Sequence, residues 1–266
     1  MVKNYNTLKV FVINLHDDTS KRERMKKILL NFSFNYDFFE AFDGRKSDIK
    51  SFEGYNDFKR KLFLGRSLFP SELGALESNR LIYKKMVEEN IEMALILEDD
   101  IFIDNNFEKY LKKILQIDYN WELIRFIENE KINHSKGRII VKLDDKYNLK
   151  RYPKLFGGSH AYLIKKNGAK KLLKLMNNFY HHIDIIMGET WKNNLNSLIC
   201  NPGLVLQDPK LNVSPKNHPR FKKKEKNIHS VYFLTRFFFK IYESLAKWIH
   251  YYLKLFPDLI AIKKTN

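Results

Sequence analysis

Three adjacent carboxylates, Glu98, Asp99 and Asp100, directly follow residues 93–97, a fully apolar segment typical of a buried strand. Acids this close repel one another and lose hydration when buried, and a divalent cation relieves both effects. Carboxylate oxygens suit Mg²⁺ or Mn²⁺. Because side chains alternate along a strand, Glu98 and Asp100 can face one side, with Asp100 as the candidate direct metal ligand and Glu98 helping directly or through water. Asp99 faces the other side and is a candidate for binding the rest of the ligand. The alternative is a solvated acidic turn.

Other polar residues could contact a nucleotide beside these acids. Asn14 and Leu15 end the first apolar segment, where a side-chain amide and main-chain groups could meet a base or ribose. Arg22 could pair with a diphosphate, and Asp43 with Gly44 could contact ribose hydroxyls. The alternatives are an ordinary strand end, a solvated helix charge and a tight turn.

Two further candidates lie later in the chain. His160 follows a glycine pair that permits close approach of the backbone to a ligand, and it could bind an acceptor or a metal; the alternative is a structural histidine. Gln207 ends the last apolar segment beside Asp208 and could supply a second metal or phosphate contact. The sequence contains no GxSxG, Walker A or GxGxxG motif, so serine-hydrolase, P-loop and dinucleotide-binding functions lose their main support.

The elements that must position these residues alternate between short apolar segments and helical patterns. We expect a helix capped by Thr19 or Ser20, one beginning at Pro70, one at 106–116 and one capped by Asn167, and a loop-rich stretch at 45–69. We expect strands at residues 8–15, 36–42, 93–97, 122–127, 138–143, 149–152, 159–164, 198–200 and 204–207. This alternation predicts an α/β fold with a mainly parallel sheet, whose ligands gather at the carboxyl ends of strands.

Composition narrows the class of protein. The chain has 266 residues and a net charge of +17, so its surface should seek polyanions such as anionic lipid, nucleic acid or phosphorylated substrates. Cys200 is the single cysteine, which excludes an intrachain disulfide and indicates a reducing compartment. We find no signal peptide and no uncharged run of about 18 residues that could span a bilayer.

The C-terminal residues differ from the rest. Residues 216–266 contain 12 Lys or Arg and three acids, which is +9 of the total +17, so we divide the chain into a domain at 1–215 and a basic tail at 216–266. Within 228–256 the charged residues fall on one narrow stripe of a helix and the remaining surface is apolar and aromatic. With the polybasic run at 222–226, this pattern is typical of a surface anchor on an anionic membrane. The alternatives are packing on the domain or on a second copy in a homodimer.

Five segments together resemble glycosyltransferase family 25, the bacterial lipooligosaccharide glycosyltransferases whose distant relatives are collagen galactosyltransferases. They are VFVINLHDDTSKRERM (10–25), FFEAFDGR (38–45), PSELGALESNRLIYKKM (70–86), ALILEDDIFI (94–103) and GGSHAYLIKKNGAKKLL (157–173). The resemblance implies a GT-A-like, Rossmann-type fold, a UDP-sugar donor that is commonly UDP-galactose, inversion at the anomeric carbon, and a Mn²⁺-type ion at the acidic triplet. It also implies donor-sugar contacts for Ser78 and Asn79 and a match at Asp184. The chain departs from the family pattern Gly-Cys-x-x-Ser-His, because Asn79 stands where histidine is expected and cannot shuttle protons near neutral pH.

An inverting transfer needs a base for the acceptor hydroxyl, and Asp184 and Glu189 are the candidates outside the triplet. The leading hypothesis is therefore a metal-dependent hexosyltransferase that uses a UDP-hexose and a lipid-linked oligosaccharide of the lipopolysaccharide core. We expect it to be cytoplasmic and peripheral on the inner face of the bacterial inner membrane. The alternatives are a basic nucleic-acid-binding protein and a nucleotidyltransferase using the same carboxylates. The first alternative is disfavoured because over half of the excess charge lies in the tail and no nucleic-acid-binding module is recognisable.

Overall fold

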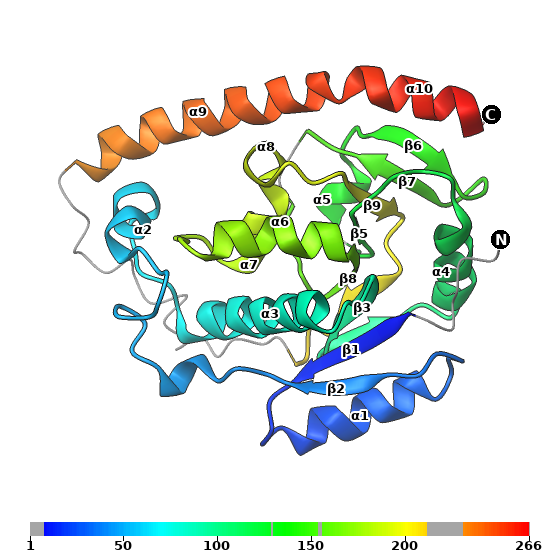
Figure 1. Cartoon of the computed structure of the whole chain (residues 1–266), viewed down its shortest axis with the longest axis horizontal. Helices are drawn as coiled ribbons and strands as arrows, with labels where there is room; N and C mark the ends of the chain where they lie inside the picture. Colours follow the sequence, from blue (N-terminus) through cyan, green and yellow to red (C-terminus); the bar gives the residue numbers. More distant parts are fainter. Residues whose placement is uncertain (1–7, 129, 154–155, 212–230, 266) are drawn as a thin grey trace.

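The computed structural model describes residues 8–128, 130–153, 156–211 and 231–265 (Figure 1). Its strands are β1 (Lys9–Asn14), β2 (Asp37–Glu40), β3 (Met93–Glu98), β4 (Ile101–Ile103), β5 (Leu123–Arg125), β6 (Arg138–Lys142), β7 (Asn148–Arg151), β8 (Ala161–Lys165), β9 (Ser197–Asn201) and β10 (Val205–Gln207). Its helices are α1 (Thr19–Leu29), the 3₁₀ turn η2 (Gly44–Lys46), α2 (Asp57–Leu64), α3 (Pro70–Glu88), α4 (Phe107–Gln116), α5 (Glu130–Asn133), α6 (Lys166–Met176), α7 (Ile183–Gly188), α8 (Thr190–Asn193), α9 (Tyr232–Leu253) and α10 (Leu255–Thr265).

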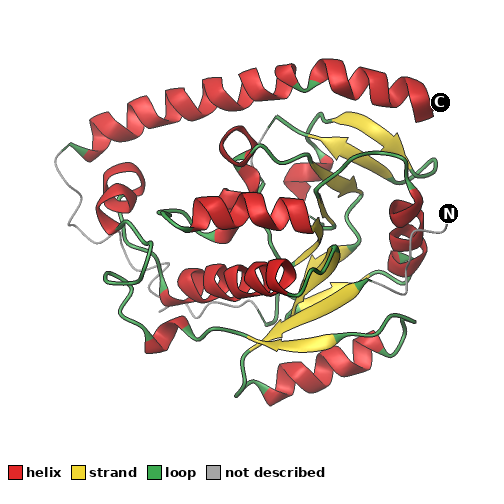
Figure 2. Ribbon diagram, in the orientation of Figure 1, coloured by secondary structure: helices red, strands yellow, loops and turns green. Residues whose placement is uncertain are grey.

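Eight strands form one mixed sheet in the order β2-β1-β3-β8-β5-β9-β7-β6. β1 pairs in parallel with β2 and β3, and β5 pairs in parallel with β9, whereas β8 and β7 run antiparallel to their neighbours. Six of the eight strands therefore point the same way. The prediction of an α/β fold with helices flanking a mixed sheet is confirmed, and Figure 2 shows helices on both sides of the strands.

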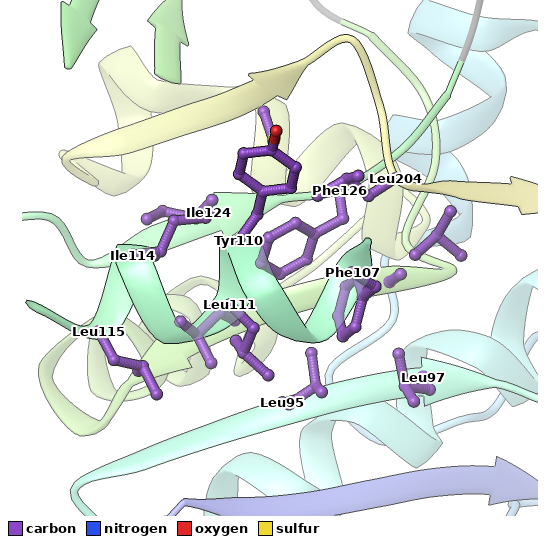
Figure 3. Packing of buried hydrophobic residues seen from close by; sticks show 14 of the residues in the cluster. Leu95, Leu97, Phe107, Tyr110, Leu111, Ile114, Leu115, Ile124, Phe126 and Leu204 are labelled. Carbon is purple, nitrogen blue, oxygen red and sulfur yellow. The ribbon is translucent and has the colours of Figure 1, made fainter. Parts of the chain in front are cut away.

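The alternation of side chains along each strand divides the core into two layers. Val12 and Leu95 belong to a cluster shared with α1 and α4, whereas Ile13 and Ile96 belong to a cluster shared with α3, α6 and α7. Figure 3 shows one of these interfaces, where the apolar face of α4 lies against β3 and β5. A sheet that is buried on both faces leaves its strand ends as the natural place for a ligand.

Two predicted helix caps are wrong. The cap of α1 is Asp18, whose carboxylate accepts from the Lys21 N–H at 3.2 Å, instead of Thr19 or Ser20. Asn167 lies inside α6, which follows β8 so closely that Lys165 occupies the cap position and makes no side-chain capping bond. The sequence therefore predicted the start of α1 one or two residues too far toward the C-terminus.

The stretch 45–69, expected to be loop-rich, contains η2 and α2. α2 begins after Asn56, which accepts from the backbone N–H of Lys59, and it ends at Gly65 with a φ of +75°. Phe63 of this helix stacks on Phe239 of α9 with ring centroids 4.7 Å apart. A contact with a helix so distant in sequence stabilises α2, which is why local periodicity missed it. The strand expected at 204–207 is present as β10, but it pairs with the short β4 in a separate two-stranded sheet.

The tail helices α9 and α10 pack along the molecule past α2, α8 and β6 (Figure 1). The Thr235 hydroxyl donates to the Leu62 carbonyl at 2.6 Å. Asp258 of α10 is 1% exposed and accepts from Arg138 at 2.7 Å and from Arg151 at 2.8 and 2.9 Å. These polar contacts, together with the buried ring of Phe239, fix both helices to the sheet and to α2.

The apolar face of the tail points outward. Its exposed side chains are Val231, Phe233, Leu234, Phe237, Phe238, Ile241, Tyr242, Leu245, Trp248, Ile249, Tyr252, Leu253, Phe256, Leu259 and Ile260. Most of the predicted charged stripe is half-buried on the inward side, namely Arg236, Glu243, Lys247 and Lys254. The alternative in which the apolar face packs on the domain is therefore wrong for most of this face. No described helix is both long and apolar enough to cross a bilayer. The polybasic run at 222–226 and the proposed boundary at 215/216 lie outside the described residues.

Candidate active site

A pocket of about 460 Å³ opens at the carboxyl ends of β1 and β3, between the segment that follows β2 and the start of α3. It gathers nine of the predicted site residues: Asn14, Leu15, Asp43, Gly44, Ser78, Asn79, Glu98, Asp99 and Asp100. These residues come from four separate parts of the chain, so the parallel pairing of β1 with β2 and β3 is what brings them together. The volume is in the range of small-molecule and cofactor sites.

Glu98 is the last residue of β3 and lies in the pocket wall. Its carboxylate accepts from the Ser159 hydroxyl at 2.9 Å, and its backbone N–H donates to the His160 carbonyl at 2.9 Å. Burial, followed by the negative charges of Asp100 and Asp184, raises the pKa of Glu98 to about 8. A carboxyl group in this environment is stabilised by a nearby cation.

The other two acids have different surroundings. Asp99 accepts from the Asn14 amide at 2.8 Å and from the Lys21 ammonium at 3.3 Å, so protein groups already neutralise it. Asp100 is 8% exposed and accepts from Gln207 at 3.3 Å through one oxygen. Its other oxygen is buried and has no hydrogen-bond partner among the described protein atoms.

These observations fit a divalent cation held by Glu98 and Asp100. The unpartnered Asp100 oxygen lacks a positive partner, and the raised pKa of Glu98 records the same deficit. Both donors are carboxylate oxygens, which Mg²⁺ and Mn²⁺ prefer. Asp99 also lines the pocket, where it pairs with Lys21 at 3.3 Å; it lies beyond the end of β3, so strand alternation does not place it on the opposite side.

Asp184 and Glu189, the two candidate bases, lie in different environments. Asp184 accepts from the backbone N–H of Gly158 at 3.0 Å, and its charge contributes to the raised pKa of Glu98. Glu189 is 2% exposed and pairs with Lys192 at 2.6 Å and His181 at 3.4 Å. Neither Asp184 nor Glu189 is among the described residues that line the pocket. The geometry therefore favours Asp184 over Glu189.

His160 and Gln207 lie behind the carboxylates. The His160 ring lies 3.2 Å from the Val205 carbonyl, and burial lowers its pKa. Gln207 reaches Asp100, and the backbone N–H of Asp208 donates to the Asp100 carbonyl at 2.7 Å. Gln207 thus positions Asp100, and neither His160 nor Gln207 is among the described residues that line the pocket.

Two cations of the pocket were missed by sequence reasoning. Arg22 was predicted, but it stacks on the Phe38 ring at 4.3 Å and does not line the pocket. Lys21 and Arg45 line it instead. The cap at Asp18 is the feature of the sequence from which the role of Lys21 could have been predicted. With this cap, the first turn of α1 is oriented so that Lys21 reaches Asp99.

The α3 wall is held by a network of hydrogen bonds. The Ser78 hydroxyl donates to the Gly74 carbonyl at 2.7 Å and accepts from the Phe42 N–H at 2.9 Å, which anchors the segment after β2. The Asn79 amide donates to the Ala75 carbonyl at 2.7 Å and accepts from the Tyr162 hydroxyl. Ser78 and Asn79, which were predicted to contact the donor sugar, therefore already have hydrogen-bond partners within the protein.

Gly44 allows the segment after β2 to touch α3. A Cβ at this position would lie 2.1 Å from the Pro70 carbonyl oxygen and 2.9 Å from the Gly74 nitrogen. Only glycine permits this close approach without a backbone shift. The neighbouring Asp43, paired with Arg45 at 2.7 Å, is thereby placed at the pocket rim.

Comparisons with known proteins identify the family of the chain. The sequence profile of glycosyltransferase family 25 (LPS biosynthesis protein) matches residues 7–187. Procollagen galactosyltransferase 1-B of Xenopus laevis is 30% identical over 182 residues, which are 62% of this chain and 28% of that protein. A glycosyltransferase 25 family member of Aedes aegypti is 30% identical over 183 residues with the same two coverages.

Not every relative is active. Inactive glycosyltransferase 25 family member 3 of Homo sapiens is 26% identical over 179 residues, again 62% of this chain and 28% of that protein. The chain thus spans less than a third of the length of these relatives. Among solved structures, a glycosyltransferase involved in the glycosylation of the major capsid of PBCV-1 has a TM-score of 0.40 at 10% identity, covering 75% of this chain and 91% of that one.

Proposed function

Because the chain belongs to glycosyltransferase family 25, we propose that its pocket binds a UDP-hexose and transfers the hexose, with galactose as the first candidate, to a hydroxyl group of an acceptor. The observation that carries the proposal is the pair Glu98 and Asp100 in the pocket wall, one with a raised pKa and one with an unpartnered buried oxygen. This is where a diphosphate–cation complex would be held.

The pocket has suitable groups for each part of the donor. Asn14 and Leu15 at the end of β1 line the side where a base or ribose would lie, and Asp43 at the rim can accept from ribose hydroxyls. Lys21 and Arg45 add two cations for the diphosphate. When bound, Mn²⁺ or Mg²⁺ at Glu98 and Asp100 would neutralise the diphosphate as it leaves.

The chain's own base would be Asp184. In an inverting transfer the acceptor oxygen forms a bond to the anomeric carbon while the bond from that carbon to the diphosphate oxygen breaks, and UDP leaves with the electron pair. Asp184 would take the proton of the acceptor hydroxyl, and the Gly158 N–H holds its carboxylate in a fixed orientation. Glu189, paired with Lys192, is a less suitable base.

The acceptor would be lipid-linked, because the tail has the features of a membrane-bound face. α9 and α10 comprise 22 and 11 residues, about 50 Å of helix at 1.5 Å per residue, and their outer face is apolar and aromatic. Apolar patches of this size mark an interaction surface. The +9 charge of residues 216–266 complements an anionic bilayer better than it complements a second equally basic copy.

The membrane part of the proposal has its own test. Vesicles containing anionic lipid should sediment the protein, whereas vesicles of zwitterionic lipid alone should sediment less. The double variant Phe237→Ser with Phe256→Ser should weaken binding, because both rings are exposed on the outer face. Phe58→Ser is the matched control, since Phe58 is 68% exposed on α2. Equal binding of all three proteins would contradict membrane docking and favour the homodimer.

The enzymatic proposal is tested by incubating the full chain with Mn²⁺ and a panel of UDP-sugars and measuring released UDP. Asp100→Asn should abolish release, while Asp145→Asn, a fully exposed acid on the β6–β7 turn, should leave it unchanged. Release of pyrophosphate instead of UDP would indicate a nucleotidyltransferase. Salt-sensitive binding of nucleic acid with no UDP affinity would indicate a nucleic-acid-binding protein.

A further inference from the structure

A second cavity lies between α9 and the strands β5, β7 and β9. It is small, about 30 Å³, and is separate from the pocket at the acidic triplet, with which it shares no lining residue. This volume exceeds the roughly 10–15 Å³ that one water-sized occupant needs, and it is far too small for a sugar or nucleotide. Its walls join the tail helix to the sheet.

Four side chains that line this cavity each carry a buried polar atom without a hydrogen-bond partner among the described protein atoms. The atoms are Nε of Arg125, the hydroxyl of Tyr152, Nε1 of Trp191 and Nε2 of His250. Unpartnered buried polar atoms are rare, at a few in a whole native protein. Four of them around one small cavity indicate a common missing partner.

The chemistry of these atoms specifies that partner. Nε of Arg125 and Nε1 of Trp191 can only donate, and the Tyr152 hydroxyl can donate as well. Arg125 is 3% exposed, and its guanidinium also donates to the Phe156 carbonyl at 2.7 Å. A water molecule could accept only two of these hydrogen bonds, whereas one anion accepts from every donor and also balances the charge of Arg125.

The charge of the lining agrees with an anion. Lys150 and Lys247 add two more cations, and none of the described residues that line the cavity is acidic. The nearby Asp258 does not change this, because its two oxygens are already engaged by Arg138 and Arg151. Burial lowers the pKa of Arg125 to about 10, and the charge of Asp184, which opposes this effect, lies outside the cavity lining; an anion in the cavity would add a counter-charge there.

We propose that this cavity is a binding site for a small inorganic anion of the size of chloride, which is held by Arg125, Tyr152 and Trp191 and joins α9 to the sheet. The ion links side chains from β5, α8 and the segment after β7, and His250 of α9 closes the site. An anion that binds only the folded protein stabilises it by mass action. The anion would stabilise the contact between the tail and the sheet, and this effect requires no substrate. The proposal is therefore independent of the proposed transferase activity.

The experiment compares thermal unfolding of the full chain in sodium chloride and in sodium gluconate at equal ionic strength and pH. Chloride should raise the midpoint in a saturable way, and gluconate, which is too large for the cavity, should not. Tyr152→Phe removes one donor and keeps the ring, and Trp191→Phe removes one donor and leaves a smaller aromatic ring, so both should lose most of the chloride-specific gain. Trp121→Phe, a buried tryptophan outside the cavity, should retain it.

The quantity compared is the difference between the unfolding midpoints in the two salts. It can be measured for a variant that is less stable overall, so a general loss of stability does not affect the comparison. A crystal soaked in sodium bromide should show an anomalous peak between Arg125 and Trp191. Identical unfolding curves in chloride and gluconate, an equal chloride gain in Trp191→Phe and Trp121→Phe, or only water density in the cavity would each overturn the proposal.

Discussion

Asp258 offers the sharpest test of how the tail is attached. It is 1% exposed and accepts three short hydrogen bonds from Arg138 and Arg151, with a fourth from the Tyr119 hydroxyl at 3.2 Å. Asp258→Asn keeps the shape but removes the charge and replaces one accepting oxygen by a donor. Arg151, itself 5% exposed, then faces a donor in place of its counter-ion.

The size of the effect follows from this geometry. Each charged hydrogen bond contributes about 1.5–3 kcal/mol, but bonds that share a partner do not add, and breaking a buried ion pair costs about 3–5 kcal/mol. We therefore expect Asp258→Asn to lower the free energy of unfolding by about 3–5 kcal/mol if docking of the tail is coupled to folding of the sheet. If only the tail detaches, the loss is smaller and residues 232–265 become sensitive to protease.

Urea unfolding and limited proteolysis of the full chain distinguish these cases. Asp145→Asn is the control, because its ion pair with Lys142 is fully exposed and should contribute little to stability. Arg138→Gln in the Asp258→Asn background should add less than it does alone, since the two residues share a bond. If Asp258→Asn and Asp145→Asn unfold and are cleaved alike, the buried cluster does not hold the tail.

Three further predictions concern the pocket, its backbone and pH. Lys21→Met should raise the KM for the donor about tenfold or more, as expected for loss of one charged contact, and Arg22→Met should not; steady-state kinetics with both variants checks this. Gly44→Ala should destabilise the chain by about 1–3 kcal/mol in urea, because its Cβ would lie 2.1 Å from a carbonyl oxygen; an unchanged midpoint would contradict the close approach. Burial and neighbouring cations lower the pKa of His250 to about 4, so the unfolded chain takes up this proton at higher pH than the folded chain. In sodium gluconate, where no small anion occupies the cavity beside His250, the free energy of unfolding should therefore fall as pH drops from about 6.5 toward 4, and His250→Gln should flatten that slope; equal slopes would refute it.

The acidic triplet and the sheet around it were predictable because their signals are local. An apolar run that ends in three acids indicates a buried strand end, and β3 ends at Glu98 with all three acids in the pocket lining. The cations were not predictable in the same way. Which of Lys21 and Arg22 reaches the pocket depends on the orientation of α1. This orientation was predicted incorrectly because the wrong residue was taken as the helix cap.

The tail shows where periodicity alone is insufficient. Periodicity shows that one face of α9 is apolar, but it cannot say whether that face is buried. The structure turns Phe239 inward and leaves most other aromatic side chains exposed, such as Phe237. The second cavity could not be predicted either, because its residues are spread from Arg125 to Tyr251 and meet only after α9 docks.

The central claim, that Glu98 and Asp100 hold a cation which holds the donor, is tested most directly by calorimetric titration of metal-free protein with UDP, with and without Mn²⁺. The account predicts that Mn²⁺ strengthens UDP binding, that Asp100→Asn loses this gain by roughly 100-fold or more, and that Asp145→Asn keeps it. UDP binding of equal strength in Asp100→Asn and Asp145→Asn, each in the presence of Mn²⁺, would contradict it.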